Sequence, residues 1–243
     1  MLTLALDTSS LSGSLAVLKN DSLLGVISTR SDENYSSRMF RHLDFLLSDL
    51  SLHLRDFDLF SVAAGPGSFT GLRIGLTAAK AWSEVYNKPV VGVSALEAVA
   101  IQSFRVADST NKSLFVPVLD ARRGQIYSAF YRADRSRLIL EGDQAVMTCE
   151  ELLSALQKQT SDACVVISTP EPQLISDALS RFENSVPSNS RPSLALQVVS
   201  SVLAPSIGSL GFASAQRGEF SNALTLDANY VRRSDAELQL KGN

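Results

Sequence analysis

The chain has 243 residues, of which 45% are hydrophobic and 19% charged, and its formal net charge is -3. This composition is that of an ordinary globular protein and excludes a disordered or fibrous chain. Basic residues are dispersed apart from the pairs Arg122-Arg123 and Arg232-Arg233, which argues against an extended nucleic-acid-binding face. The N-terminus lacks a signal-peptide pattern and no apolar run approaches the roughly 20 residues of a membrane span, so we expect a cytoplasmic protein without membrane contact.

Three strands are predicted at the start of the chain, from apolar runs at 2–7, 13–19 and 23–29. The period then changes to that of an amphipathic helix over 36–50. Ser94 and Glu97 form a capping box, which marks the start of another helix. The remaining elements of this half are a strand at 59–64, a helix at 70–86, a strand at 90–93 and a helix at 94–104.

The same order recurs after an aperiodic polar segment at 105–112. A second capping box, Thr148 with Glu151, begins a helix. The other predicted elements are strands at 114–119, 126–131 and 138–140, a strand at 164–167, a helix at 172–182, a strand at 194–199 and a helix at 203–216. Each half therefore reads β-β-β-α-β-α-β-α, which predicts an α/β protein with two lobes, 1–108 and 109–243.

In each half the first strand ends at an aspartate, Asp7 or Asp120, and a glycine and a second strand follow. A duplicated lobe of the ribonuclease H type with a mixed central sheet explains this recurrence. Chance placement of turn residues is the alternative. Cys149 and Cys164 fit neither a zinc spacing nor a disulfide framework, and we interpret them as reduced thiols that act as small buried hydrophobic residues.

Glycine is densest in the segment 65–75, between a predicted strand and a predicted helix. Glycine permits close backbone approach, and free amides at a helix start attract anions. One interpretation is an anion-binding loop made by Gly65, Gly67, Ser68, Thr70, Gly71 and Arg73. The other is a tight turn whose small residues let another element pack closely. The segment is neither a Walker A loop nor a nucleophile elbow.

Several segments together resemble the TsaB (YeaZ) family. They are Leu6-Asp7-Thr8-Ser9, Gly65-Pro66-Gly67-Ser68-Phe69-Thr70-Gly71-Leu72-Arg73-Ile74-Gly75, Gly92-Val93-Ser94-Ala95-Leu96-Glu97-Ala98 and Asp120-Ala121-Arg122-Arg123-Gly124-Gln125-Ile126-Tyr127. Tyr230-Val231-Arg232 resembles the family's terminal Tyr-x-Arg. The resemblance is specific over most of residues 1–131 and rests only on element order over 132–225.

The resemblance implies an actin-like ATPase (ASKHA) fold and a non-catalytic role. The family pairs with its catalytic relative TsaD, which transfers a threonylcarbamoyl group to the adenosine beside the anticodon of certain tRNAs; TsaE is the third, ATPase member. By resemblance, the chain is the scaffold subunit, and it forms a homodimer when alone. ATP and a metal ion are expected on the partner proteins, and tRNA is expected to contact this chain indirectly or weakly.

Nucleotide binding in the usual actin-like mode looks impaired. The two acidic hairpins that hold phosphates in actin-like ATPases correspond here to Asp7, Gly13, Asp120 and Gly124, which we interpret as vestigial. Arg122 and Arg123 are expected to crowd the second hairpin, and the candidate adenosine loop 168–171 has no glycine.

No metal site is expected. Active relatives carry a His-x-x-x-His pair on one helix face. The corresponding helix here has only His42, and His53 is expected past its end. Tyr35 stands where the family often has histidine, so no role is inferred for that position.

The helices at 36–50 and 70–86 offer apolar ridges beside close-approach grooves, which suits a helix-bundle interface. The resemblance implies that TsaD docks there, and the predicted interface is Met39, Phe40, Leu43, Leu47, Gly71, Leu72, Gly75 and Ala79. The alternative is that both helices only cover their own sheet. On the interface hypothesis, Leu43→Glu and Gly75→Arg weaken the heterodimer and leave the monomer folded.

Two other functions stay open at this point. An autonomous actin-fold ATPase or sugar kinase would hydrolyse ATP, and Asp7→Ala would abolish that activity. A glycoprotease-like peptidase would need a nucleophile with a base, or a two-histidine metal site, and the sequence offers neither in a recognisable spacing.

Overall fold

The computed structural model describes residues 1–30, 36–106, 113–134, 137–158, 164–187 and 191–232. The chain forms two compact units. Unit 1 comprises Met1–Ala98 together with Val202–Asn243, and unit 2 comprises Val99–Ser201.

Unit 1 is built on a mixed five-stranded sheet in the order β3-β2-β1-β4-β5. Its strands are β1 (Leu2–Asp7), β2 (Ser14–Lys19), β3 (Ser22–Ser28), β4 (Leu59–Gly65) and β5 (Val90–Ser94). The first three strands are antiparallel, and β1, β4 and β5 are parallel. β1, β2 and β4 are buried along nearly their whole length, which explains why they are continuous apolar runs without alternation.

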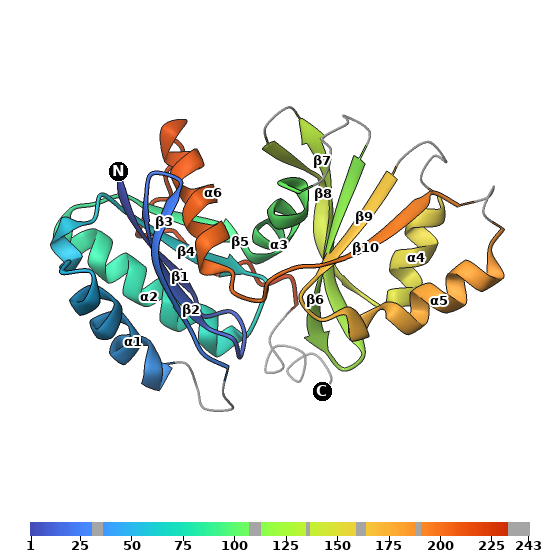
Figure 1. Ribbon diagram of the computed structural model, residues 1–243, viewed down its shortest axis with the longest axis horizontal. Coiled ribbons are helices and arrows are strands. Elements are labelled where there is room, and N and C mark those ends of the chain that lie inside the picture. The colour runs from blue at the N-terminus through green and yellow to red at the C-terminus, as the bar shows by residue number, and fades with distance from the viewer. Residues whose placement is uncertain (31–35, 107–112, 135–136, 159–163, 188–190, 233–243) are drawn as a thin grey trace, which may run out of the picture. The chain divides into compact units, whose positions relative to one another are not determined.

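Helices cover both faces of this sheet (Figure 1). The helices of unit 1 are α1 (Ser36–Asp49), α2 (Phe69–Tyr86) and α6 (Ala204–Gln216), with a 3-10 turn at η1 (Leu54–Asp56). Ser61 Oγ donates a hydrogen bond to the carbonyl oxygen of Ile207 on α6, whereas a Cβ at Gly75 of α2 would meet Val62. Because successive strand residues point to opposite faces, α2 and α6 lie on opposite sides of the sheet.

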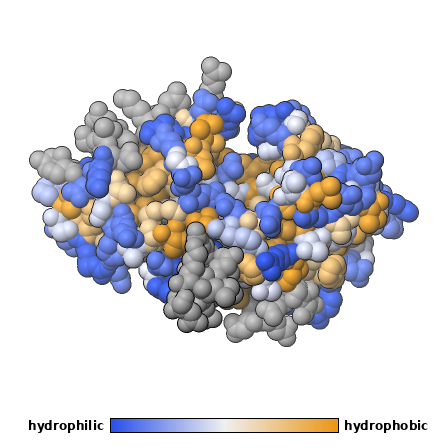
Figure 2. Space-filling model, turned by 180° about the vertical axis from the view of Figure 1, so that it is seen from behind, coloured by the Kyte–Doolittle hydropathy of each residue, from blue (hydrophilic) through white to orange (hydrophobic). Residues whose placement is uncertain are grey.

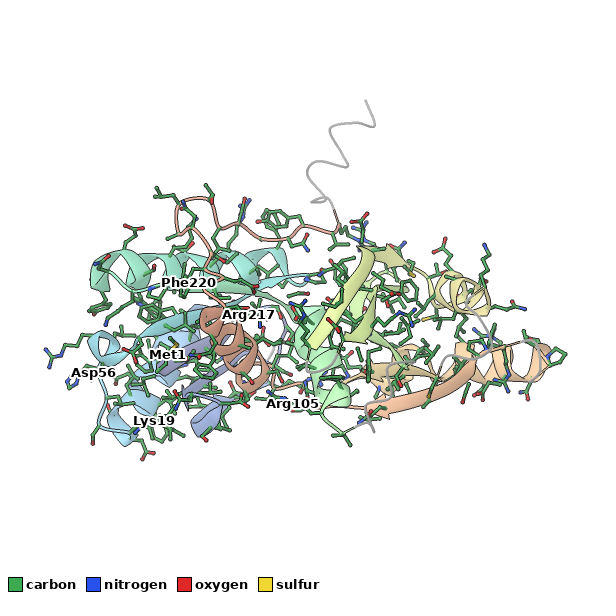
Figure 3. All side chains as sticks on the ribbon, turned by 90° about the horizontal axis from the view of Figure 1, so that it is seen from above. Met1, Lys19, Asp56, Arg105, Arg217 and Phe220 are labelled. Atoms are coloured by element: carbon green, nitrogen blue, oxygen red, sulfur yellow. The ribbon has the colours of Figure 1, made fainter. Side chains whose placement is uncertain are left out.

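The segment after α6 also belongs to unit 1. After Arg217 and Phe220 it runs alongside α2 (Figure 3), and Lys80 Nζ donates to the carbonyl oxygen of Leu226 at 2.9 Å. Ser221 bridges to Val90 at the edge of β5. The predicted lobes 1–108 and 109–243 therefore differ from the compact units, because α6 and the described residues after it pack on the first sheet.

Unit 2 contains a second mixed sheet in the order β10-β9-β6-β7-β8. Its strands are β6 (Ser113–Arg122), β7 (Gln125–Asp134), β8 (Arg137–Met147), β9 (Cys164–Thr169) and β10 (Ser193–Val198). The helices are α4 (Cys149–Gln157), α5 (Ser176–Ser185) and most of α3 (Ala95–Phe104), with a 3-10 turn at η2 (Pro172–Leu174). Leu152, Leu153 and Leu156 of α4 pack with Val116, Val118 and Ile167 in one hydrophobic core.

The predicted element order is confirmed in both halves, and so is the Thr148–Glu151 capping box, with both of its hydrogen bonds. Three details were wrong. β8 extends to Met147, because its hydrogen bonds to β7 continue past the polar residues that ended the sequence pattern. The helix predicted at 172–182 is broken at Ile175 into η2 and α5. Cys149 is buried as expected, but Cys164, at the start of β9, is exposed.

In the part of the chain that the structure describes, no helix is both long and apolar enough to cross a bilayer.

On the face seen in Figure 2, hydrophobic residues form small groups between hydrophilic ones. Scattered exposed apolar residues are normal on globular proteins, so a binding surface has to be identified from its shape and lining.

Candidate functional site

The glycine-rich segment links β4 to α2. Gly65 has a φ of 113°, and the Gly65-Pro66 peptide bond is cis. Ser68 is the N-cap of α2, where its Oγ accepts a hydrogen bond from Gly71 N at 3.3 Å. This geometry is the tight strand-to-helix turn that the sequence allowed as one of two interpretations.

The turn between β1 and β2 packs directly against this segment. Ser68 N donates to the carbonyl oxygen of Ser9 at 2.7 Å, and Thr8 Oγ1 donates to the carbonyl oxygen of Gly71 at 2.7 Å. A Cβ at Gly67 would lie 2.6 Å from Ser9 O, and Cβ atoms at Gly71 and Gly75 would overlap Thr8. The glycines are therefore required by a close backbone approach within unit 1, which favours the packing interpretation over the anion-binding one.

Asp7 holds that same turn in place. The residue is fully buried, and its Oδ1 accepts hydrogen bonds from Ser9 N at 2.8 Å and from Ser9 Oγ at 2.6 Å. Oδ2 has no hydrogen-bond partner among the described residues. Burial raises the pKa of Asp7, and the two bonds from Ser9 act in the opposite direction. Gly13 follows as a buried residue before β2.

In the second aspartate hairpin, Asp120 contacts both the backbone and the side chain of Arg122. Asp120 Oδ1 accepts from Arg122 N at 2.7 Å, and the guanidinium Nε of Arg122 lies 3.5 Å from Asp120 Oδ2. Arg122 and Arg123 have φ values of 64° and 57°, and Gly124 has 71°. Two consecutive arginines thus adopt the left-handed conformation that glycine adopts without strain.

The candidate adenosine loop uses its polar groups internally. Ser168 and Thr169 are buried. Ser168 Oγ donates to Ser103 Oγ at 2.6 Å, and Glu171 N donates to Thr169 Oγ1 at 3.1 Å. In this loop and in the two hairpins, these polar groups are thus hydrogen-bonded within their own units.

His42 and His53 lie on different elements. His42 is on α1, where burial and then the charges of Arg38 and Arg41 lower its pKa. His53 lies past the end of α1, as expected, and its backbone N donates to Asp56 Oδ2 at 2.7 Å. Within the described ranges, no three His, Cys, Asp or Glu side chains are grouped closely enough to share a metal ion. Tyr35 lies outside the described residues.

An open groove lies on the outward face of α2, next to α1. Its volume is about 610 Å³. The groove is lined by Phe40, Phe69, Thr70, Arg73, Ile74, Thr77, Ala78, Ala81 and Trp82. Phe40 is 59% exposed and Phe69 is 37% exposed. Short side chains let a second helix approach closely, and exposed apolar rings beside them offer surface that such a helix can bury.

Most of the predicted interface residues face inward and do not line this groove. Met39, Leu43, Leu47, Leu72 and Ala79 are buried, and Gly71 and Gly75 pack on Thr8. Their periodicity marks the helix faces that cover the sheet, as the alternative interpretation held. Phe40 is the predicted residue that does line the groove. Accordingly, Leu43→Glu and Gly75→Arg disturb the core of unit 1 and are unsuitable as interface variants.

Thr77, Ala81 and Trp82 also line the groove and were not predicted from the sequence. A signal was present, because Thr70, Arg73, Thr77 and Ala81 recur at steps of three and four along α2 and are all exposed. They form a second stripe on the helix that is polar or small rather than strongly apolar, and a search for apolar ridges does not detect it.

Arg73 lies at one end of the groove in a three-membered stack. Its Cζ is 3.8 Å from the centroid of the Phe69 ring, and its Nε donates to Tyr230 Oη at 3.0 Å. The Phe69 and Tyr230 rings are themselves 4.9 Å apart between centroids. Tyr230 is held in turn by its neighbour, because Asn229 N donates to the carbonyl oxygen of Ala64 at 2.6 Å.

Comparisons with known proteins identify the family. The family described as "TsaD: tRNA N6-adenosine threonylcarbamoyltransferase" matches residues 15–181, more than half of the chain. The tRNA threonylcarbamoyladenosine biosynthesis protein TsaB of Bacillus subtilis strain 168 is 36% identical over 153 residues, which are 63% of this chain and 65% of that protein. The chain belongs to this family, in its TsaB (YeaZ) branch.

Solved structures of the TsaB (YeaZ) type and beyond share the fold. YeaZ from Pseudomonas aeruginosa has a TM-score of 0.71 at 24% identity, covering 94% of this chain and 99% of that one. A ROK family protein from Streptococcus pneumoniae TIGR4, solved in complex with sucrose, has a TM-score of 0.53 at 11% identity, covering 90% and 99%. At these identities the likeness concerns the fold alone, and the fold is the expected actin-like one.

Proposed function

We propose that this chain is a non-catalytic subunit in the biosynthesis of threonylcarbamoyladenosine in tRNA, and that it docks a TsaD-type catalytic relative through the groove on α2. The observation that carries the proposal is the contrast between the two candidate sites. The glycine-rich segment is filled by Thr8 and Ser9 of the same unit, whereas the groove beside Phe40 is open and apolar. The names of the TsaB relatives support the pathway.

The shape of the groove supports a helix as the docked element. Its lining combines the short side chains of Thr77, Ala78 and Ala81 with the large rings of Phe40, Phe69 and Trp82. A partner helix with small and apolar residues would bury the exposed rings of Phe40 and Phe69 and exclude water, which is the arrangement that gives binding hot spots. Without the partner, a second copy of this chain is expected to use the same surface.

The remaining assignments follow from this role. ATP and a metal ion are proposed to reside on the partner proteins, because Oδ1 of Asp7 and Oδ1 of Asp120 each already accept hydrogen bonds from this chain. TsaE is proposed to join a larger complex, and tRNA to contact this chain indirectly or weakly. The site of action is the cytoplasm, where tRNA is modified.

Ala81→Arg tests the docking surface. Ala81 is exposed and lines the groove, so an arginine there projects into the space that a helix would occupy. We expect binding to the cognate TsaD, measured by isothermal titration calorimetry, to weaken by roughly 100-fold, with an unchanged thermal unfolding midpoint.

Val85→Arg is the matched control. Val85 lies on the same helix, is 73% exposed and does not line the groove. This variant should bind like the unmodified chain. Equal affinity of Ala81→Arg and the unmodified chain would contradict docking in the groove, and no binding by either would contradict the subunit role.

Autonomous ATPase activity is tested on the purified chain alone. The proposal predicts no ATP turnover above the background of a preparation of Asp120→Ala. Turnover by the unmodified chain that Asp120→Ala abolishes would contradict the non-catalytic assignment and support the kinase-like alternative.

A further inference from the structure

Arg73 is held in one orientation before any partner binds. Its guanidinium stacks on Phe69 at 3.8 Å, and Tyr230 Oη accepts a hydrogen bond from its Nε. A free arginine side chain loses considerable rotamer freedom when it forms a complex. The stack has already restricted that freedom in the unbound chain, so less entropy is lost on binding.

The two terminal amino groups of Arg73 are available to a ligand. Nε is the atom that donates to Tyr230, and no described residue accepts a hydrogen bond from either Nη atom. These two groups together carry four N–H donors. The residue is exposed, so a planar acceptor can reach them from outside the chain. A carboxylate is the protein group that matches this donor geometry.

The rest of the groove carries no charge. Arg73 is the one ionised side chain among the residues that line it; the others are aromatic, aliphatic or threonine. An occupant that matches the groove must therefore be apolar along most of its length and bear one negative charge at the Phe69 end. A partner with no acid at that end would leave the guanidinium partly desolvated and unpaired, which costs binding energy.

We propose that Arg73 is the specificity-determining residue of this groove, and that it binds an Asp or Glu carboxylate on the helix of the catalytic partner that fills it. Tyr230 is the positioning residue, because it fixes Nε and leaves the outer edge of the guanidinium for the ligand. This inference rests on the proposed function and adds to it the chemistry by which the partner is recognised.

The same geometry assigns a role to the terminal Tyr-x-Arg segment. Tyr230 is 157 residues from Arg73 in sequence and reaches it because the chain after α6 returns along α2 (Figure 3). Two hydrogen bonds anchor this returning segment. Asn229 N donates to the carbonyl oxygen of Ala64 on β4, and Lys80 Nζ on α2 donates to the carbonyl oxygen of Leu226. The segment thus completes the rim of a surface that is otherwise made by α1 and α2.

Calorimetric titration with the cognate TsaD tests the inference. Arg73→Met retains most of the side-chain volume and removes the charge, and we expect it to weaken binding by about 30-fold or more. Arg73→Lys keeps the positive charge but lacks the paired donors of the guanidinium, so its affinity for TsaD should lie between those of the unmodified chain and Arg73→Met. Arg55→Met is the matched control: Arg55 is exposed on η1, does not line the groove, and its removal should change the affinity less than about twofold.

Tyr230→Phe separates positioning from folding. It keeps the ring beside Phe69 and removes the acceptor for Arg73 Nε, so we expect about threefold weaker binding. In the Arg73→Met background the same change should have no effect on affinity, because Tyr230 acts through Arg73. A purely structural role of Tyr230 would give the same loss in both backgrounds.

A charge exchange identifies the acceptor. In the Arg73→Glu background, replacing the Asp and Glu residues of the partner's docking helix by Arg one at a time should restore binding for one of them. Arg73→Met binding within twofold of the unmodified chain would overturn this inference and leave the docking proposal standing. If the unmodified chain does not bind, both fail. Loss of self-association in Arg73→Met together with an unchanged affinity for TsaD would assign the arginine to contact with a second copy and overturn the inference.

Discussion

The two faces of α2 use small residues for opposite purposes. On the inward face, Gly71 and Gly75 leave room for the backbone and hydroxyl of Thr8, and the contact is closed. On the outward face, Thr77 and Ala81 line a groove that stays open. Small residues on a helix therefore indicate close approach, and they do not indicate whether the approaching element belongs to the same chain.

This contrast changes how the glycine-rich segment is interpreted. A loop that is rich in glycine at a helix start resembles an anion-binding site in sequence. In this chain Ser68 N donates to Ser9 O, and Gly71 N donates to Ser68 Oγ, so two amides at this helix start already have partners. The Nη donors of Arg73 lie further along the helix and on its other face.

The largest predicted effect contrasts the two faces of α1. Leu43 is 4% exposed and Phe40 is 59% exposed. Leu43→Glu places a carboxylate in the core of unit 1, and we expect a loss of at least about 4 kcal/mol in the free energy of unfolding. Phe40→Glu should change it by less than about 0.5 kcal/mol. Urea denaturation of the purified variants measures both; equal losses would contradict the assignment of faces.

Next in size is the closed face of α2. Gly71→Ala introduces a Cβ that overlaps the carbonyl oxygen of Thr8, so the turn between β1 and β2 must move. We expect a loss of about 3 kcal/mol. Thr77→Ala on the open face is the control, with an expected change below about 0.5 kcal/mol. Chemical denaturation that finds Gly71→Ala neutral would show that the two faces are not distinct.

A smaller effect is expected at the helix start. Ser68 Oγ accepts from Gly71 N as the N-cap of α2, and Ser68→Ala removes this acceptor. The expected loss is about 1 kcal/mol, measured by thermal unfolding. Thr70→Ala, one position inside the helix, serves as the comparison and should be near neutral. A similar loss in both variants would argue against a specific cap.

The smallest effect depends on pH and concerns Asp7. Burial raises the pKa of Asp7 in the folded state above its value in the unfolded chain, which is near 3.8. The protonated carboxyl therefore contributes stability that is fully present below the unfolded pKa and is lost as pH rises through the folded pKa. Asp7→Asn cannot ionise, so its stability relative to the unmodified chain should increase above about pH 4. Urea unfolding from pH 3.5 to 8 measures this difference, and a flat profile would contradict it.

The element order was predictable because hydrophobic periodicity determines which residues face the sheet, as on α1 and α2. Capping chemistry added precision, as at Thr148 with Glu151. The assignment of α6 to the first sheet was not predictable, because nothing local in its sequence distinguishes one sheet from the other. Its packing depends on Gly208 and Gly211, which allow Leu18 and Ser61 to approach.

The candidate site was predicted less well for a related reason. Helical periodicity in the sequence marks the apolar stripe Met39, Leu43 and Leu47, which is the stripe that a helix buries in its own unit. The groove residues Thr77 and Ala81 carry no strong signal individually. Arg73 was noted, but its partner Tyr230 lies 157 residues away, and only the fold brings the two together.

The route of the chain also sets an order of events during synthesis. Unit 2 is one continuous stretch, Val99–Ser201, whereas unit 1 needs both Met1–Ala98 and Val202–Asn243. Until α6 has left the ribosome, one face of the first sheet has no cover, and until Ser221 follows, the edge of β5 is unpaired. Unit 2 can therefore finish folding before unit 1, although its synthesis begins later. A nascent chain that stalls near residue 201 exposes the uncovered apolar face and the unpaired edge of the first sheet to chaperones and proteases.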